Sequence, residues 1–307
     1  VYKRQVIAFN TRRESFRDVR VREALTLAMD FEWQNRVFHH GSRERALSYF
    51  ASSQFAATGT PSGKELELLS RFRDQLPARV FSEPFALPAS LGRGQHREAL
   101  ERARSLLAAV GWRIKDGRLV NPRGEQFQLE LLTQNPAYQR ILLPYVEALK
   151  LLGIDARVRL ADSALAINLL RERNYDAYVR GHDFLNPPGS ELRGAFSSET
   201  ADLQMSYNMA GVQDPIVDAL IEEAERAGTI EAATAALKAL DRVLLWSFYN
   251  IPLHATEEER FLWWDKFGRP KHEAVAKYEN LVGSSLRILD SWWFDPEKAA
   301  RLAIVGK

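Results

Sequence analysis

Hydrophobic residues along the chain follow two different periods, and the change from one to the other divides it into elements. Residues 18–30 carry an apolar stripe at helical spacing behind Asp18, a residue type that caps helix starts, so this segment is predicted to be a helix packed on a core. The stripe consists of Val21, Leu25, Ala28 and Met29. Residues 41–93 show no sustained period and are rich in Ser, Gly, Pro and aromatic residues, which indicates a long loop region with a short helix near residues 62–72.

Regular alternation of strand and helix patterns follows this loop region. The predicted helices span residues 97–109, 138–152, 163–173, 215–227 and 230–246, and the predicted strands span 6–9, 126–132, 154–160, 176–180, 251–255 and 260–264. Asp116-Gly117 is predicted to turn a short hairpin. Strands separated by helices of about 10–15 residues favour an α/β fold with a mostly parallel sheet flanked by helices.

Composition narrows the classes of function. The 307 residues include 42 Lys and Arg against 40 Asp and Glu, so the net charge of +2 creates no large field of one sign, and nucleic acid is not an expected partner. No apolar run approaches the roughly 18–20 residues that a membrane helix requires. The chain has no cysteine and six scattered histidines, and the adjacent His39 and His40 would point to different faces of a helix. No metal or other cofactor is therefore expected.

The sequence also lacks the motifs that would indicate an enzyme. It contains no Gly-x-Ser-x-Gly nucleophile elbow, no His-Glu-x-x-His metal motif and no glycine-rich phosphate loop. The acidic run at residues 257–259 is explained better as a solvated turn than as a set of catalytic carboxylates. We therefore expect no catalysis, and the rival hypothesis of a glycoside hydrolase rests only on the aromatic-rich loops.

Four segments, in their order along the chain, carry a family resemblance. They are Phe9-Asn10-Thr11 with Phe16-x-Asp18-x-Arg20-Val21-Arg22, Gly111-Trp112 with Asp116-Gly117, Tyr175-Asp176 through Asp214-Pro215, and Leu240-Asp241-Arg242 through Ile251-Pro252-Leu253. Together they resemble the extracellular solute-binding proteins of family 5, the oligopeptide-binding proteins of ABC transporters. The resemblance covers nearly all of residues 6–300, and it corresponds to the second half of a typical member.

Further segments resemble one branch of that family, which takes up microcin-C-type and murein-derived peptides. They are Asn10-Thr11-Arg12-Arg13, Ser62-Gly63-Lys64-Glu65-Leu66, Phe72-Arg73-Asp74-Gln75-Leu76-Pro77, Leu240-Asp241-Arg242-Val243-Leu244 and Trp264-Asp265-Lys266-Phe267. The chain departs from the branch at residues 188–192, where it reads Pro-Gly-Ser-Glu-Leu instead of the expected Pro-Gly-Asn-Glu-Gln.

The resemblance implies a lobe of the type II periplasmic-binding-protein kind and a division of the chain into three parts. Residues 1–9 would be a crossing strand, residues 10–259 the second α/β lobe, and residues 260–307 a C-terminal segment that returns to a missing first lobe. Because the chain starts without Met or a signal segment, we expect a truncated start whose signal peptide was lost with the first lobe. We give residues 1–5 no structural weight. The natural partners of the crossing strand would lie in the missing lobe, so the strand should be frayed or mispaired. The four tryptophans of the tail should be exposed, namely Trp263, Trp264, Trp292 and Trp293.

Asp183 is the strongest candidate for ligand binding. It follows a predicted apolar strand at its carboxyl end, where open α/β sheets place their ligand crevice. The resemblance assigns the aligned Asp to the ammonium group of a bound peptide, a charge-assisted contact. The alternative is that Asp183 caps a helix starting near Gly189. Asn186, three residues further on, belongs to the same predicted ligand loop.

The remaining candidates each have a structural alternative. Glu191 and Arg193 either hold a second ligand charge or pair with each other on the surface. Tyr207 and Asn208 either face the ligand or serve ordinary turn chemistry. Arg12 either reaches the cleft between lobes or is an exposed loop arginine. Trp33 either packs on ligand side chains or, with Tyr49 and Phe50, fills a core.

The function implied by the resemblance is that of a periplasmic substrate-binding component of an ABC transporter. Its partners would be a peptide ligand and the permease subunits, through which it would be peripheral to the inner membrane. Ligand bridging two lobes would stabilise a closed state that the transporter recognises. A third hypothesis, besides the hydrolase, is a ligand-sensing receptor module built on the same fold.

Overall fold

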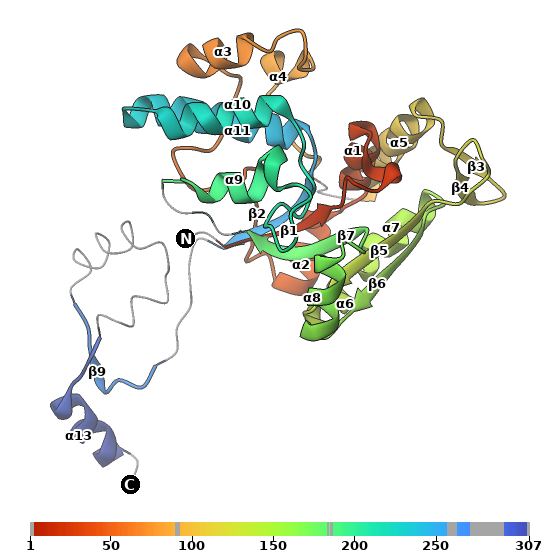
Figure 1. The fold of residues 1–307 in the computed structure, drawn as a ribbon. Coiled ribbons are helices and arrows are strands. Elements are labelled where there is room, and N and C mark those ends of the chain that lie inside the picture. The colour runs from red at the N-terminus through yellow and green to blue at the C-terminus, as the bar shows by residue number, and fades with distance from the viewer. Residues whose placement is uncertain are drawn as a thin grey trace.

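The computed structural model describes residues 3–89, 93–182, 184, 187–256, 263–270 and 292–305. Most of them form one α/β lobe around a six-stranded sheet, as Figure 1 shows. The strands lie in the order β2-β8-β1-β7-β5-β6. Their bounds are β1 Lys3–Phe9, β2 Glu44–Arg45, β5 Gln128–Thr133, β6 Asp155–Leu160, β7 Ala177–His182 and β8 Asn250–Thr256.

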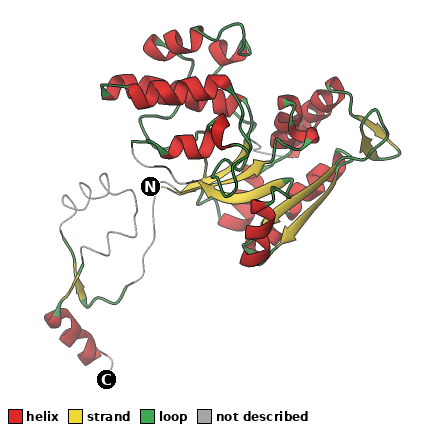
Figure 2. Ribbon diagram, viewed as in Figure 1, coloured by secondary structure: helices red, strands yellow, loops and turns green. Residues whose placement is uncertain are grey.

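Four strands of the sheet run in one direction and two run against them. β5 pairs in parallel with both β6 and β7, whereas β1 is antiparallel to β7 and β8, and β2 is antiparallel to β8. The α/β prediction is confirmed, but the sheet is mixed where we expected it to be mostly parallel, because β1 lies between β7 and β8 and runs against both. Helices cover both faces of this sheet (Figure 2).

The prediction of a frayed first strand is wrong. β1 pairs on both sides, from Arg4 opposite His182 to Phe9 opposite Ala177 on β7, and with β8 along its other edge. Its residues Ile7 and Phe9 are fully buried in the core. The strand therefore finds its partners inside this lobe. The low weight given to residues 1–5 was also mistaken, because Arg4 is buried.

The predicted helices are all present within a few residues of their expected bounds, whereas α2, α4 and α9 of the following list were not among them. The helices of the lobe are α1 Val19–Leu27, α2 Phe31–His39, α3 Gly63–Ser70, α4 Arg79–Ser82, α5 Arg93–Ala109, α6 Pro136–Ile141, α7 Leu143–Leu151, α8 Ser163–Arg171, α9 Glu191–Phe196, α10 Pro215–Arg226 and α11 Ile230–Trp246, with short 3-10 turns at Glu14–Phe16 and Ser198–Thr200. The carboxylate of Asp18 accepts a hydrogen bond from the Arg20 amide and caps α1 as expected. The hairpin is β3 Arg113–Lys115 with β4 Arg118–Val120.

Two cores hold the lobe together. The first lies between one face of the sheet and α1, α5 and α7, with Ile7, Leu129 and Val179 from the strands. The second lies among α9, α10, α11 and the long loop region, and it contains Tyr49 and Phe50. The expectation that these two aromatic residues fill a core is therefore confirmed. A smaller, third cluster packs α8 against β5 of the sheet, to which Leu132 belongs.

Two adjacent charged residues of α11 fasten the long loop region. The Asp241 carboxylate accepts hydrogen bonds from the Ser48 hydroxyl and the Tyr49 amide, both at 2.7 Å, and from the Ala57 amide at 2.8 Å. The Arg242 guanidinium pairs with Glu65 on α3 at 2.7 Å. Buried charges are stable only with such partners, so α11 fixes a segment that has little regular structure of its own.

The described part of the C-terminal segment forms a small unit of β9 Phe267–Gly268, β10 Trp293–Phe294 and α13 Pro296–Val305. Figure 1 shows it apart from the lobe. Trp263, Trp264 and Trp293 are exposed, which confirms the prediction for three of the four tryptophans, while Trp292 is half-buried against Trp263. The predicted strand at 260–264 lies largely outside the described residues.

Candidate functional site

One edge of the sheet collects the carboxyl ends of several strands. β5, β6, β7 and β8 all end there, and β1 starts there, with Lys3 opposite Thr256. β5 and β7 pair only from Leu131 to Leu132, whereas β7 stays paired with β1 as far as His182. β5 ends at Thr133, so β7 continues towards His182 without β5 beside it, and open α/β sheets bind their ligands in the crevice outside the carboxyl ends of the strands.

A groove of about 380 Å³ opens beside this end of β7. The side of β5 contributes Thr133, and the side of β7 contributes Tyr178 and Arg180. The described residues that line it are Gln5, Thr133, Gln134, Asn135, Tyr138, Leu170, Tyr178, Val179, Arg180, Gly181, Tyr207 and Met209. Among these described residues Arg180 is the one with a charge, and the others supply amides, tyrosines, the Thr133 hydroxyl, apolar side chains and the backbone of Gly181. The size is that of a small-molecule or peptide side-chain site.

The loop of residues 201–211, which we call the clasped loop, forms the outer wall of the groove. Side chains from elsewhere in the lobe donate hydrogen bonds to its backbone carbonyl groups. The donors are Thr11 to Ala210 and Gly211, Arg12 to Ala201, Asn208 and Met209, Arg173 to Leu203, Tyr175 to Met209, and Arg180 to Tyr207. Since backbone carbonyls near a surface otherwise bond to water, these contacts give the loop a defined shape.

Gly211 makes the central contact of this clasp possible. Its φ of +71° is open to glycine, and a Cβ there would come within 2.8 Å of the Arg12 guanidinium carbon. Asn208 is fully buried beneath the loop, where its side-chain amide bonds to the Ser197 carbonyl and to both backbone groups of Val212. The apolar and aromatic side chains that the loop turns outward are Leu203, Met205 and Tyr207, exposed by 57%, 56% and 68%, and the polar Asp202 and Gln204 are exposed beside them.

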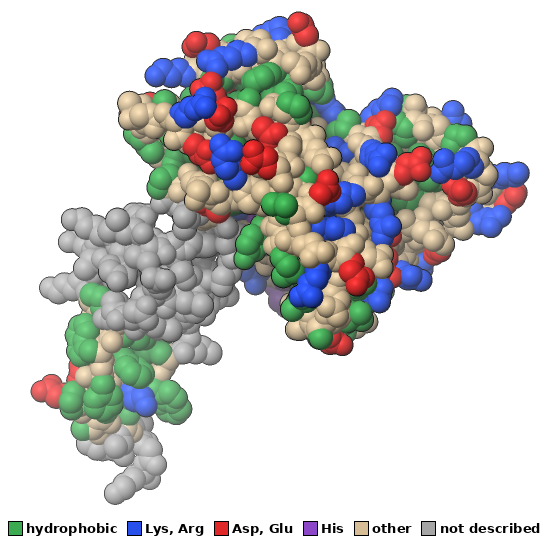
Figure 3. Space-filling view, viewed as in Figure 1, with side chains coloured by type: hydrophobic (Ala, Val, Ile, Leu, Met, Phe, Trp, Pro, Cys, Tyr) green, Lys and Arg blue, Asp and Glu red, His purple; other side chains and the backbone are tan. Residues whose placement is uncertain are grey.

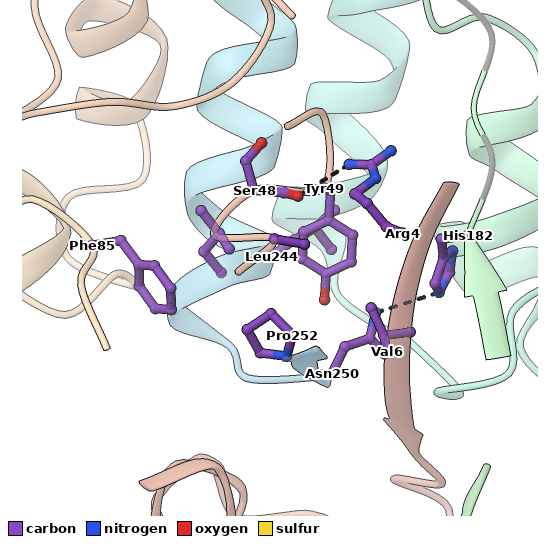
Figure 4. A pocket seen from close by; sticks show the side chains of 11 residues that line it. Arg4, Val6, Ser48, Tyr49, Phe85, His182, Leu244, Asn250 and Pro252 are labelled. Atoms are coloured by element: carbon purple, nitrogen blue, oxygen red, sulfur yellow. Dashed lines mark hydrogen bonds between the residues drawn. The ribbon is translucent and has the colours of Figure 1, made fainter. Parts of the chain in front are cut away.

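A second, much smaller cavity of about 20 Å³ lies between the sheet and α11 (Figure 4). Arg4 and His182 reach it from the groove edge of β1 and β7, and Asn250 reaches it from β8. Its volume suits about one water molecule. Burial lowers the pKa of His182 well below its usual value, so its imidazole is neutral where it packs with the rings of Phe184 and Phe196 in a three-ring cluster. The cavity is therefore part of the core beneath the site and has no room for a ligand side chain.

The structure brings three of the predicted site residues together at the groove. Tyr207 lines it, while Arg12 and Asn208 hold the loop that carries Tyr207. Trp33 lies on α2 and is partly exposed. Its ring and that of Phe38 pack edge to face, with 6.1 Å between the ring centroids. It lies outside the groove lining.

The other predicted site residues lie around α9 or outside the described part of the chain. Arg193 forms a two-point ion pair with Glu225 of α10, with a shortest distance of 2.7 Å. Glu191 accepts a hydrogen bond from the Gly189 amide at 3.1 Å. Asp183 and Asn186 fall among residues that the structure leaves undescribed, so their contact with a ligand stays a prediction.

Sequence reasoning missed most of the groove lining. Gln5 was set aside with the start of the chain, although it lies opposite Gly181 of β7 and accepts a hydrogen bond from the Tyr138 hydroxyl at 3.3 Å. Tyr178 and Arg180 interrupt an otherwise apolar strand with polar groups just before its end. That alternation is the signal by which both could have been recognised as facing the site.

Charge and possible metal ligands give no further site. Figure 3 shows acidic and basic side chains interspersed over the visible face of the lobe, with hydrophobic side chains gathered on the described part of the C-terminal segment. Among the described residues no three His, Asp or Glu side chains are grouped as a metal site requires. Helices within the same residues are all too short or too polar to cross a membrane.

Comparison with known proteins identifies the family. Residues 2–204 match the model for the middle region of the bacterial extracellular solute-binding proteins, family 5. The chain belongs to this family. The family 5 assignment agrees with the position of the groove, since solute binding needs an open crevice at the sheet edge.

Relatives and solved structures extend over nearly the whole chain. An uncharacterised protein of Escherichia coli K12, YejA, is 37% identical over 303 residues, which is 98% of this chain and 48% of that protein. A probable peptide-binding protein of Agrobacterium fabrum is 34% identical over 290 residues, 94% of this chain and 46% of that protein. The chain thus spans about half the length of these curated relatives.

Comparison with solved structures supports the fold. The oligopeptide-binding protein AppA of Bacillus subtilis, solved in complex with a nonapeptide, matches with a TM-score of 0.64 at 18% identity, over 96% of this chain and 52% of that one. At this identity the likeness establishes the fold, a lobe of the type II periplasmic-binding-protein kind.

Proposed function

We propose that this chain is the ligand-binding lobe of the substrate-binding component of an ABC transporter. It captures peptides or peptide conjugates in a cleft between two lobes and delivers them to the permease, which it meets at the outer surface of the inner membrane. The site of action is the periplasm. Family membership and the name of the Agrobacterium relative as a probable peptide-binding protein both support this proposal.

One observation carries the proposal: the chain enters and leaves the lobe at the rim of the groove. β1 and β8 are hydrogen-bonded neighbours, and the register places Lys3 opposite Thr256 at the groove edge of the sheet. Any lobe connected through these two strands would face the groove directly. A ligand held there would touch both lobes, so its binding energy would favour the closed arrangement over the open one.

The chemistry of the groove suits a peptide. Amide side chains both donate and accept hydrogen bonds, as the backbone of a peptide demands, and the groove offers three of them in Gln5, Gln134 and Asn135. We further propose that Asp183, which directly follows the last residue of β7, binds the peptide ammonium group.

The test is a capture experiment on the full-length protein. We expect the protein, incubated with a mixture of short random-sequence peptides and desalted by gel filtration, to retain peptides that mass spectrometry identifies. A permease reconstituted with it should then transport the retained peptides. Failure to retain any peptide, together with turnover of labelled glycans, would favour the glycoside hydrolase instead.

A further inference from the structure

We propose that the groove is a pocket for one aromatic side chain of the bound peptide, and that the clasped loop is its preformed wall. This inference rests on the proposed function, because it names which peptides the site prefers. The groove, the clasp and the exposed side chains of the loop carry it together, and each is a property of described residues.

The lining of the groove has the composition of an aromatic side-chain pocket. Tyr138, Tyr178 and Tyr207 supply three rings, and Leu170, Val179 and Met209 supply the apolar surface around them. Aromatic pairs in edge-to-face or offset contact are worth more than their buried area alone. Three amide side chains lie in the same lining, where Gln5 and Asn135 use their oxygens to accept hydrogen bonds from the Tyr138 hydroxyl and the Ala137 amide, and amide groups of this kind can bond the peptide backbone on either side of such a ring.

A positively charged side chain is held in place within the lining. Arg180 is the one charged side chain among the described residues of the lining, and its guanidinium is oriented by hydrogen bonds from Nε to the Gly181 carbonyl and from Nη1 to the Tyr207 carbonyl, both at 3.0 Å. An aromatic ring would be attracted through its π face, an arrangement that this lobe already uses where Arg22 lies 4.9 Å from the Tyr249 ring centre.

The clasp makes the wall rigid before a ligand arrives. Three arginines and two hydroxyl-bearing residues hold the carbonyl groups of the loop, so ordering Tyr207 costs little on binding, and such preorganisation increases affinity. Tyr207 nevertheless exposes 68% of its surface, and Met205 beside it is exposed too. An ordered loop that presents apolar side chains to water at the rim of a groove provides surface for a ligand to cover.

The experiment begins with the peptides that the full-length protein retains from a random mixture. We expect aromatic residues to be enriched about tenfold or more at one peptide position, relative to Leu, Lys and Glu. One retained peptide and its counterpart with that residue replaced by Ala are then titrated by calorimetry. The ratio of their two dissociation constants, about tenfold or more in the wild type, should fall to roughly threefold or less in Tyr207→Ser.

Two further variants separate the pocket from general stability. Arg173→Met removes the donor to the Leu203 carbonyl and the Ser206 hydroxyl outside the groove, so it should lower the ratio while Arg173→Lys restores part of it. Leu151→Ser, on α7 and 60% exposed, is the matched control and should leave the ratio unchanged. Arg173 acts here as a positioning residue.

The outcomes are distinct. Retained peptides without aromatic enrichment, preferential retention of acidic residues at the same position, or an unchanged ratio in Tyr207→Ser would each overturn this inference and leave the peptide-binding function standing. A protein that retains no peptide would refute the proposed function and this inference with it.

Discussion

The buried ion pair between α3 and α11 provides a quantitative test of how the long loop region is held. Arg242 is fully buried and Glu65 nearly so, with Nε to Oε1 at 2.7 Å. The other two guanidinium nitrogens donate to the carbonyl groups of Gly59 and Thr58 at 2.8 Å and 3.2 Å. One side chain therefore neutralises a buried carboxylate and satisfies two backbone acceptors.

Removing one partner should cost far more than removing both. Arg242→Met leaves the Glu65 carboxylate buried without its counter-charge, which we expect to lower the free energy of unfolding by about 3–5 kcal/mol. The double variant Arg242→Met/Glu65→Leu has no buried charge and loses mainly the donors to two carbonyls, at about 1 kcal/mol each. The double variant should therefore be more stable than the single one by roughly 1–3 kcal/mol.

Urea unfolding followed by tryptophan fluorescence measures both values, provided that the slope with urea concentration is the same in each variant. Arg71→Met is the control, because Arg71 pairs with Glu223 at 2.5 Å but both side chains are about half exposed, and its loss should cost less than about 1 kcal/mol. If the double variant is less stable than Arg242→Met, the buried charge is not the source of the cost and this account of the loop anchor is wrong.

Three further predictions follow from other sites. Burial lowers the pKa of His254 to about 4, whereas the same side chain in the unfolded chain has a pKa near 6.5, so the stability that the neutral buried His254 allows is complete above pH 6.5 and is lost as the pH falls towards 4. His254→Gln should therefore reduce the acid-induced loss of stability by up to about 3 kcal/mol. Identical acid-unfolding curves for the wild type and this variant would contradict the prediction. Arg12→Met should speed amide exchange across residues 201–211 while β1 stays protected, whereas uniform exchange rates would show that Arg12 does not hold the loop. In the full-length protein Asp183→Asn should weaken binding of peptides with a free N-terminus by roughly 2–4 kcal/mol and hardly affect N-acetylated peptides, as calorimetry on both ligands would measure; equal losses would remove Asp183 from the site.

Local patterns predicted the elements of the fold well, and the reasons are visible in particular residues. Asp18 caps α1 and the apolar stripe behind it is buried, as the spacing indicated. The predicted helix at 138–152 is divided at Leu142 because Pro144 lacks an amide hydrogen and starts a new helix, α7. That proline was in the sequence and would have given the boundary.

The pairing of strands and the groove could not be derived in the same way. β1 is central because β7 and β8, separated from it by more than 160 residues, both pair with it. The partners of Arg12 are carbonyl groups of residues 201, 208 and 209, and backbone carbonyls have no sequence signature. Such long-range contacts appear only once the chain is folded, which is why a residue predicted for the cleft proved to support its wall.

The clasp on residues 201–211 also bears on how this protein can change over evolutionary time. Its hydrogen bonds go to main-chain oxygens of the loop, which every amino acid possesses, so they constrain the path of the loop and leave the identity of its outward side chains open. Substitutions at Leu203, Met205 and Tyr207 can therefore alter what the rim of the groove presents without disturbing the lobe beneath. Under the proposed role of the groove, the main-chain atoms of the loop maintain its path while its side chains set the ligand preference, so single mutations at its surface would be enough to change that preference.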